Sequence, residues 1–202
     1  MTAVIRLAAE SVAANGSWMA WNLLLALIPL AVAVMLFLHP TRRTLGWWLG
    51  VGLFLAFLPN APYVLTDVIH LVEDTRTTSS PAVVSFALLP QYAVFFLVGF
   101  EAYVLSLLLV GRYLQRVGLA RWVLPVEVAL HALCAIGVHL GRFERLNTWD
   151  VLTRPALIGR GIAGMNASLL VLAFLSIALG YLVMKHLTLA VLSYRSSRIH
   201  YG

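Results

Sequence analysis

Long uncharged runs of apolar residues constrain this chain more than any other feature of its sequence. The first runs from Trp18 to Leu38, and further runs of similar character follow it. A helix that crosses a bilayer needs about 20 mostly apolar residues, and runs of this length are typical of membrane spans. The composition agrees, because 61% of the residues are hydrophobic and only 11% are charged. The sequence therefore predicts an all-α integral membrane protein.

The predicted fold is one helical bundle over residues 1–202, with about five spans and at most six. The second apolar run is interrupted by the residues PNAP at 59–62, which predicts a short or jointed span followed by an amphipathic or re-entrant helix. The single cysteine, Cys134, excludes an intramolecular disulfide. The predicted spans are residues 18–38, 45–58, 82–109, 122–140 and 167–192.

The charge balance reports topology. Fourteen Lys and Arg against eight Asp and Glu give a net charge of +6, which in a soluble domain would suggest a nucleic-acid partner. Here the basic residues lie mainly between and after the apolar runs, as cytoplasmic loops of membrane proteins do. We therefore expect no nucleic-acid partner, an outer N-terminus and a cytoplasmic C-terminus. The loop 141–164 is basic for an outer loop, and argues for a miscounted span or the inverse orientation.

A polar stripe follows the interruption, within the predicted outer loop 59–76. Asn60 followed by Pro62 favours a helix start at which the Asn side chain caps free backbone donors. In a helix over 61–74, one face carries all the polar side chains of the stripe: Tyr63, Asp67, His70 and Asp74. Two interpretations stay open. The helix lies in the membrane interface with its stripe in water, or the stripe faces a cavity and presents ligands.

Asp67 and His70 are the candidate catalytic pair. They are three residues apart, the spacing that brings a carboxylate and an imidazole together on one helix face, where they could perform general acid–base catalysis. The same pair is a weak candidate for metal binding, which needs at least one more ligand, such as Asp74 or His139. The sequence identifies no cofactor.

The second polar segment is GRFERLNTWD at 141–150, within the predicted outer loop 141–164. Arg142 and Arg145 are three residues apart and are predicted to share a helix face, from which guanidinium groups suit phosphate or carboxylate. Asn147 is predicted to cap the following helix, with Asp150 accepting the reciprocal bond and Arg154 one turn further on. The plainer interpretation is headgroup anchoring by the arginines and helix capping by the other two.

Two phrases together resemble a known family. LPNAPYVLTDVIHL at 58–71 and LGRFERLNTWD at 140–150 resemble the bacterial membrane family called domain of unknown function 1361, and WNLLLALIPL at 21–30 resembles the first span of that family. The chain departs from the family pattern at Thr148, where serine is expected, and at Glu144, where a hydrophobic residue is expected. The resemblance implies a polytopic protein of the bacterial cytoplasmic membrane, and no established reaction or ligand.

Ionisable residues inside the spans form a second candidate cluster. Such groups are expensive in a bilayer and are hypotheses about function by default. Pairing among them would offset this cost and fix helix packing, whereas a proton or ion relay is the functional alternative, and Lys185 could instead reach the headgroups. The members at similar predicted depth are Glu101, Glu127, His131 and Lys185.

Three functions remain open. The first is a binding or catalytic site at the outer interface for an anionic headgroup or a small anionic ligand, with Asp67 and His70 as the catalytic pair. The second is a small transporter or proton-coupled channel subunit, although the sequence shows no internal repeat of the kind common in transporters. The third is a structural or assembly subunit. Enzymatic activity and oligomeric state stay open. The predicted ligand-binding residues of the first site are Asn60, Tyr63, Arg142, Arg145, Asn147 and Asp150.

Overall fold

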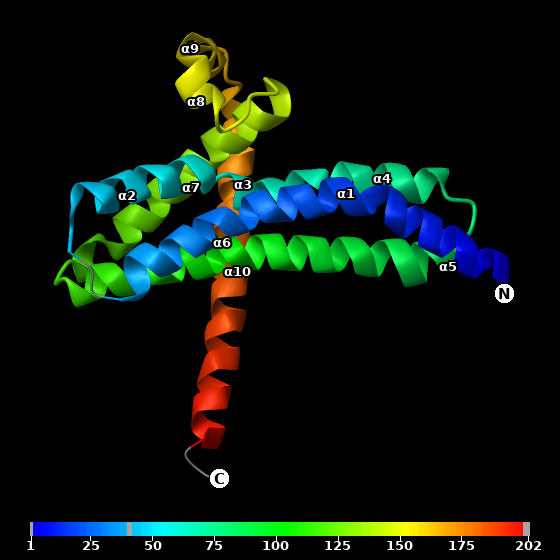
Figure 1. Cartoon of the computed structure of the whole chain (residues 1–202), viewed down its shortest axis with the longest axis horizontal. Coiled ribbons are helices and arrows are strands. Elements are labelled where there is room, and N and C mark those ends of the chain that lie inside the picture. Colours follow the sequence, from blue (N-terminus) through cyan, green and yellow to red (C-terminus); the bar gives the residue numbers. More distant parts are fainter. Residues whose placement is uncertain (1, 40–41, 200–202) are drawn as a thin grey trace. The chain divides into compact units, whose positions relative to one another are not determined.

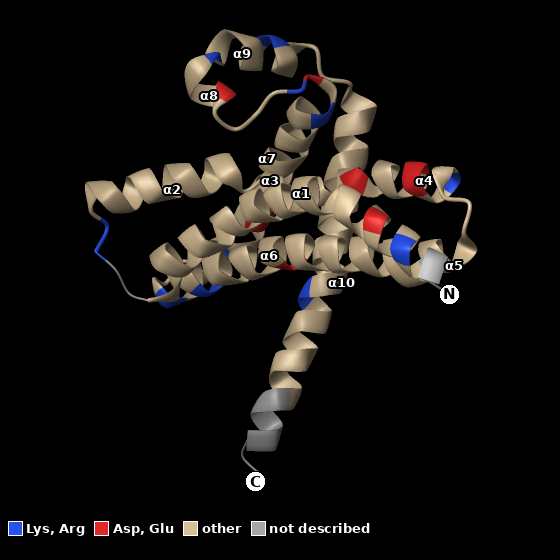
Figure 2. Cartoon of the chain, turned by 45° about the vertical axis from the view of Figure 1, so that its right-hand side comes forward, with Lys and Arg blue, Asp and Glu red and all other residues tan. Residues whose placement is uncertain are grey.

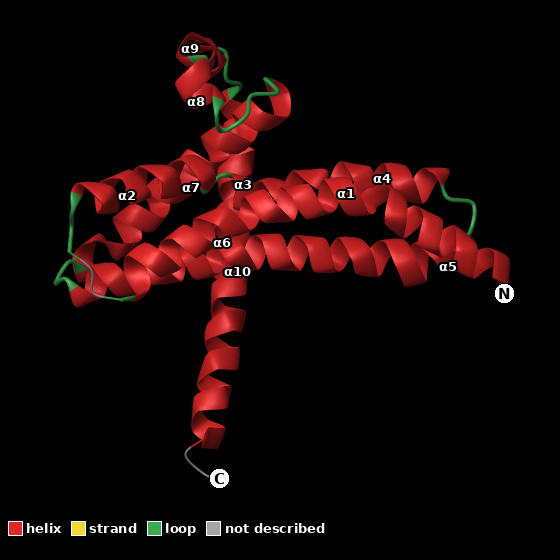
Figure 3. Cartoon of the chain, in the orientation of Figure 1, coloured by secondary structure: helices red, strands yellow, loops and turns green. Residues whose placement is uncertain are grey.

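A computed structural model describes residues 2–39 and 42–199, and side chains within residues 5–39 and 42–194. Its regular structure is helical, and no strand occurs within these ranges (Figure 3). Five helical segments are long and apolar enough to cross a membrane, which confirms the prediction of an all-α multi-span membrane protein. These segments are Ile5–Leu38, Leu45–Thr77, Pro81–Arg116, Ala120–Phe143 and Ala167–Tyr194.

The chain forms two compact units, residues 1–103 and 104–202. Figure 1 labels their α-helices. Helix α6 (Leu89–Arg116) runs from the first unit into the second. The other helices of the first unit are α1 (Thr2–Ala33), η1 (Val34–Leu38), α2 (Leu45–Phe57), α3 (Asn60–Tyr63), η2 (Val64–Asp67), α4 (Val68–Thr77), α5 (Pro81–Val83) and η3 (Val84–Leu88). Those of the second are η4 (Ala120–Trp122), α7 (Val123–Phe143), α8 (Asp150–Thr153), α9 (Pro155–Ala163) and α10 (Ala167–Ile199).

The first span is longer than its apolar run. Helix α1 begins at Thr2, far ahead of the predicted start at Trp18. Its early residues are rich in alanine, a strong helix former, and Arg6 Nε donates to Glu10 Oε1 at 2.8 Å one turn away. The third span also extends beyond its predicted limits, to Arg116. Hydropathy marks the part of a helix that suits lipid, and the helix itself continues further.

In the first unit, α1 packs against α2, α3 and η3. The buried core includes Phe54, Leu58 and Phe95. Gly99 of α6 allows an especially close approach, because a Cβ there would lie 2.8 Å from both methyl carbons of Val64. Helix α6 therefore contacts η2 directly, at the joint of the second span.

In the second unit, α7 packs against α10, with Cys134 and Ile177 among the buried residues. Helix α9 folds back onto the end of α7. Gly161 permits this contact, since a Cβ there would lie 2.7 Å from Leu140 Cδ2. The long helices carry little charge and α2 carries none, whereas acidic and basic residues lie around α8 and α9 (Figure 2).

Candidate functional site

The two acidic side chains of the polar stripe, Asp67 and Asp74, are bonded to side chains of the first unit. The Asp67 side chain, at the end of η2, is buried, and its residue is only 2% exposed. Its Oδ2 accepts a hydrogen bond from Asn22 Nδ2 of α1 at 3.2 Å. Asp74 Oδ2 accepts from Asn15 Nδ2 at 2.6 Å and from the Tyr92 hydroxyl at 2.9 Å. The carboxylates of Asp67 and Asp74 are therefore bonded within the protein.

Apolar side chains occupy the outward face of α4. Val68, Ile69 and Val72 are all exposed, and the charged Glu73 and Arg76 are exposed toward the end of the helix. In a bilayer the outer surface meets lipid, so polar groups must find partners inside the protein. Periodicity separates the two faces of a helix, but which face turns outward depends on the solvent. We call the inward-facing group the polar seam; its members are Asn15, Trp18, Asn22, Asp67, His70, Asp74 and Tyr92.

Within the candidate catalytic pair, His70 is more accessible than Asp67. The His70 side chain is 44% exposed, and its Nε2 lies 4.0 Å from Asp67 Oδ1. That separation is too long for a hydrogen bond, but it is within reach of an ion pair if the imidazole is protonated. The ring also packs against Trp18, with centroids 5.2 Å apart. A buried carboxylate beside a half-exposed imidazole is an arrangement that supports acid–base chemistry.

The joint before the seam differs from its prediction. Helix α3 begins after Pro59 without a side-chain cap, so the prediction that Asn60 caps it is wrong. Asn60 Nδ2 donates instead to the Phe57 carbonyl at 2.9 Å, because the free carbonyls at the end of α2 need donors. The predicted continuous helix is also wrong, since η2 interrupts it. Within the described contacts the Tyr63 side chain makes no hydrogen bond.

Helix α7 ends before the second arginine of the GRFERLNTWD segment. The helix stops at Phe143, and Arg145 has a φ of 53°, in the left-handed region. The Leu146 N–H donates to the Leu140 carbonyl at 3.2 Å and closes the helix end. The prediction that Arg142 and Arg145 share a helix face is therefore wrong, because the helix ends at Phe143, before Arg145.

Asp150 is fully buried and ties this loop together. Its Oδ2 accepts from the Asn147 N–H at 2.7 Å, and its Oδ1 accepts from Arg154 Nη2 at 2.6 Å, as predicted. Helix α8 begins after Trp149 with no side-chain cap, so the expected cap by the Asn147 side chain is wrong. The Asn147 N–H, and with it the Arg154 guanidinium, hold the pKa of the Asp150 carboxyl below its ordinary value against the opposing effect of burial.

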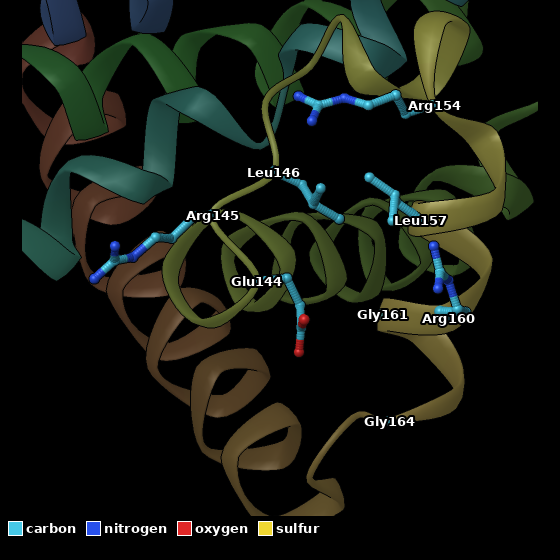
Figure 4. Close-up of a pocket in the computed structure, with 8 residues that line it drawn as sticks. All are labelled: Glu144, Arg145, Leu146, Arg154, Leu157, Arg160, Gly161 and Gly164. Atoms are coloured by element: carbon cyan, nitrogen blue, oxygen red, sulfur yellow. The ribbon is translucent and has the colours of Figure 1, made fainter.

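A pocket of about 510 Å³ lies between this loop and α9 (Figure 4). We call it the arginine pocket. Figure 4 shows Arg145 on one side of it, and Arg154 and Arg160 on the other. Arg145 and Arg160 are exposed, and within the described part of the chain neither is in an ion pair. The lining residues are Glu144, Arg145, Leu146, Arg154, Leu157, Arg160, Gly161 and Gly164.

Three ionisable residues of the second unit's spans, Glu127, Tyr181 and Lys185, are bonded together. Glu127 Oε1 accepts from the Tyr181 hydroxyl at 2.6 Å and from Lys185 Nζ at 2.7 Å. The His131 ring packs on Tyr181, with centroids 4.9 Å apart. These contacts join α7 to α10, which is consistent with the alternative that the buried ionisable residues pair to fix helix packing. Glu101 belongs to the first unit, so its membership of this cluster stays a prediction.

No group of three or more His, Cys, Asp and Glu residues suited to hold a metal ion occurs within the described ranges. Asp67 and His70 therefore gain no third ligand there. Sequence reasoning missed four members of the polar seam, Asn15, Trp18, Asn22 and Tyr92, as well as Arg160. The signal was available, because two amides seven residues apart lie on one face of a helix.

The comparison with protein families matches residues 21–184 to "Protein of unknown function (DUF1361)". The matched range contains both phrases on which the resemblance was based. Neither a curated protein nor a solved structure matches the chain. Since the family match covers well over half of the chain, this membrane protein belongs to the DUF1361 family of unknown function.

Proposed function

We propose that this membrane protein binds an anionic group, a phosphate or a carboxylate, in the arginine pocket. The observation that carries the proposal is a hollow lined by three arginines, of which Arg145 and Arg160 have no ion-pair partner among the described residues; the Arg145 side chain points away from the other lining residues in Figure 4. Guanidinium groups offer several donors in a planar fork that fits both anions. The pocket lies between the fourth and fifth candidate spans, where the chain leaves the membrane.

The carboxylates near the pocket do not neutralise all of its arginines. Asp150 is already bonded to Arg154 and to a backbone N–H, so it fixes one arginine as part of the wall. Glu144 is the only acidic lining residue, against three arginines. In Figure 4 its carboxylate points away from Arg154. Arg160 would thus supply donors to an incoming anion directly, and Arg145 would supply them by turning its side chain toward the hollow.

Titration calorimetry of the detergent-solubilised protein with glycerol 3-phosphate tests the proposal. Each charge-assisted bond contributes about 1.5 kcal/mol or more, so Arg145→Ala and Arg160→Ala should each weaken binding by about tenfold. Arg76→Ala removes an exposed arginine at the end of α4, outside the pocket, and should bind like wild type. Equal affinity of all four proteins for glycerol 3-phosphate would refute the proposal.

A second candidate function, acid–base catalysis, rests on the contact of His70 with buried Asp67. It predicts that the protein in phospholipid vesicles slowly releases a headgroup or fatty acid, and that His70→Gln stops this release without unfolding the protein. Mass spectrometry of the lipids detects either product. A release rate that is the same with wild type, with His70→Gln and with empty vesicles would dismiss this function.

We further propose that the chain lies in the bacterial cytoplasmic membrane with its N-terminus outside and its C-terminus in the cytoplasm. The arginines between spans one and two and between spans three and four support this orientation. Membrane-impermeant maleimide applied to intact cells should label Arg76→Cys and not Arg112→Cys, both in a Cys134→Ser background. The reverse pattern of labelling would invert the orientation.

A further inference from the structure

The loop that forms the arginine pocket has an apolar outer surface. Leu152, on α8, is 87% exposed, one of the highest values for a large apolar side chain in the described structure. Such a surface between two spans is unfavourable in water and favourable in contact with lipid. The other exposed apolar side chains of this loop and its flanks are Phe143, Trp149, Val151 and Ile162.

The residue types match a helix pair that lies in the membrane interface. Trp149 is of the kind that gathers at the level of the headgroups, and α8 and α9 are too short to cross a bilayer. On α9, Leu157, Arg160 and Gly161 line the pocket, whereas Ile162 is exposed. A cationic face and an apolar face on one short helix are typical of interfacial helices.

The pocket itself is lined by both cationic and apolar side chains. Leu146 and Leu157 lie between the arginines in Figure 4. A free phosphate ion would use only the cations, whereas a phospholipid also has a glycerol backbone and acyl chains that would contact the leucines. The volume of about 510 Å³ exceeds what one phosphate group fills. The lining therefore suits the headgroup end of a lipid better than a soluble anion.

We infer that residues 149–164 lie in the lipid–water interface, and that the anion held in the arginine pocket is the phosphate of an anionic phospholipid from the adjoining leaflet. This inference rests on the proposed function and adds the source of the anion. The lipid would remain in its leaflet, with its phosphate between Arg145 and Arg160 and its upper chains beside Leu152.

Native mass spectrometry of the protein released from nanodiscs of equal phosphatidylglycerol and phosphatidylcholine tests the inference. Wild type should retain phosphatidylglycerol preferentially. Leu152→Gln removes the apolar contact of an exposed side chain, so it should fold normally and retain about tenfold less lipid, whereas Leu152→Met should retain as much as wild type. Leu152→Gln should bind glycerol 3-phosphate in detergent as wild type does.

The possible failures are distinguishable. Undiminished lipid retention by Leu152→Gln, or no preference for phosphatidylglycerol in wild type, would overturn the lipid inference while normal glycerol 3-phosphate binding leaves the proposed function intact. Loss of glycerol 3-phosphate binding in Leu152→Gln would also overturn it, because the leucine would then act on the anion itself. Glycerol 3-phosphate binding that is insensitive to Arg145→Ala and Arg160→Ala would overturn the proposed function.

Discussion

The two polar segments of this chain both carry charged residues, but the structure gives those residues different partners. In the polar seam, acidic side chains turn inward and are bonded to amides and a phenol, while apolar residues turn outward. In the loop of the arginine pocket, the acid Asp150 is buried and bonded to the lining residue Arg154, whereas Arg145 and Arg160 are exposed. The difference teaches that, in a membrane protein, the partners of a charged residue indicate its role better than its charge does.

The half-buried Asp74 and the buried Asp150 are stabilised by different sets of donors. Asp74 accepts from the neutral donors of Asn15 and Tyr92, whereas Asp150 accepts from a backbone N–H and from the cation Arg154. In each case the hydrogen bonds hold the carboxylate in place and stabilise the local structure. Among the described residues, Arg145 and Arg160 are in no ion pair, which is why we assign ligand binding to them.

The largest expected effect separates the two regions by ligand binding. The double variant Arg145→Ala/Arg160→Ala removes two charge-assisted contacts and should weaken glycerol 3-phosphate binding by about 100-fold, or about 3 kcal/mol. Tyr92→Phe, in the polar seam, should leave the affinity unchanged. Calorimetry on both proteins measures the difference, and an equal loss in both would remove the distinction between seam and pocket.

The next effect compares the packing of the two regions. Gly99→Ala forces a methyl group against Val64, whose branched side chain is stiff, so it should destabilise the protein by about 2 kcal/mol. Gly161→Ala meets the flexible tip of Leu140 and should cost less. Unfolding by dodecyl sulfate in mixed micelles gives both free energies. If Gly161→Ala proved the more damaging, the pocket loop would be packed more rigidly than the seam.

A smaller effect tests whether the seam stabilises the fold. Tyr92→Phe removes the hydroxyl that donates to Asp74 and should lower the free energy of unfolding by about 1 kcal/mol. Val72→Ala, on the outward face of α4, should change it by less than about 0.5 kcal/mol. The same micelle assay serves both variants. Comparable losses would indicate that the two faces of α4 contribute equally.

The smallest effect is the pH response of the pocket loop. Because the pKa of Asp150 lies below its ordinary value in the folded loop, the stabilisation is present above the ordinary pKa of about 4 and is lost as the pH falls through the lowered value. The amide proton shift of Asn147, followed by nuclear magnetic resonance, should therefore titrate below about pH 4. A midpoint above that value would show that Asp150 is not held as the carboxylate.

Much of the fold follows from the sequence, because hydropathy and helix length report directly on the bilayer. The five spans, the joint after Phe57 and the contacts of Asp150 with Asn147 and Arg154 were all predictable from pattern and spacing. The inward turn of the seam was not, since the periodicity of α4 is the same whichever face meets the solvent. The left-handed backbone conformation of Arg145 also escaped prediction, because no sequence signal marks an arginine that adopts it.

The most direct test of the central claim is the affinity of Asp67→Asn for glycerol 3-phosphate, measured beside that of Arg160→Glu. Asp67 is a buried member of the polar seam, whereas Arg160 is an exposed wall of the arginine pocket. We predict that Asp67→Asn binds as wild type does and that Arg160→Glu, by placing a negative charge in the pocket, abolishes binding. Binding that is lost in folded Asp67→Asn and kept in Arg160→Glu would contradict the claim.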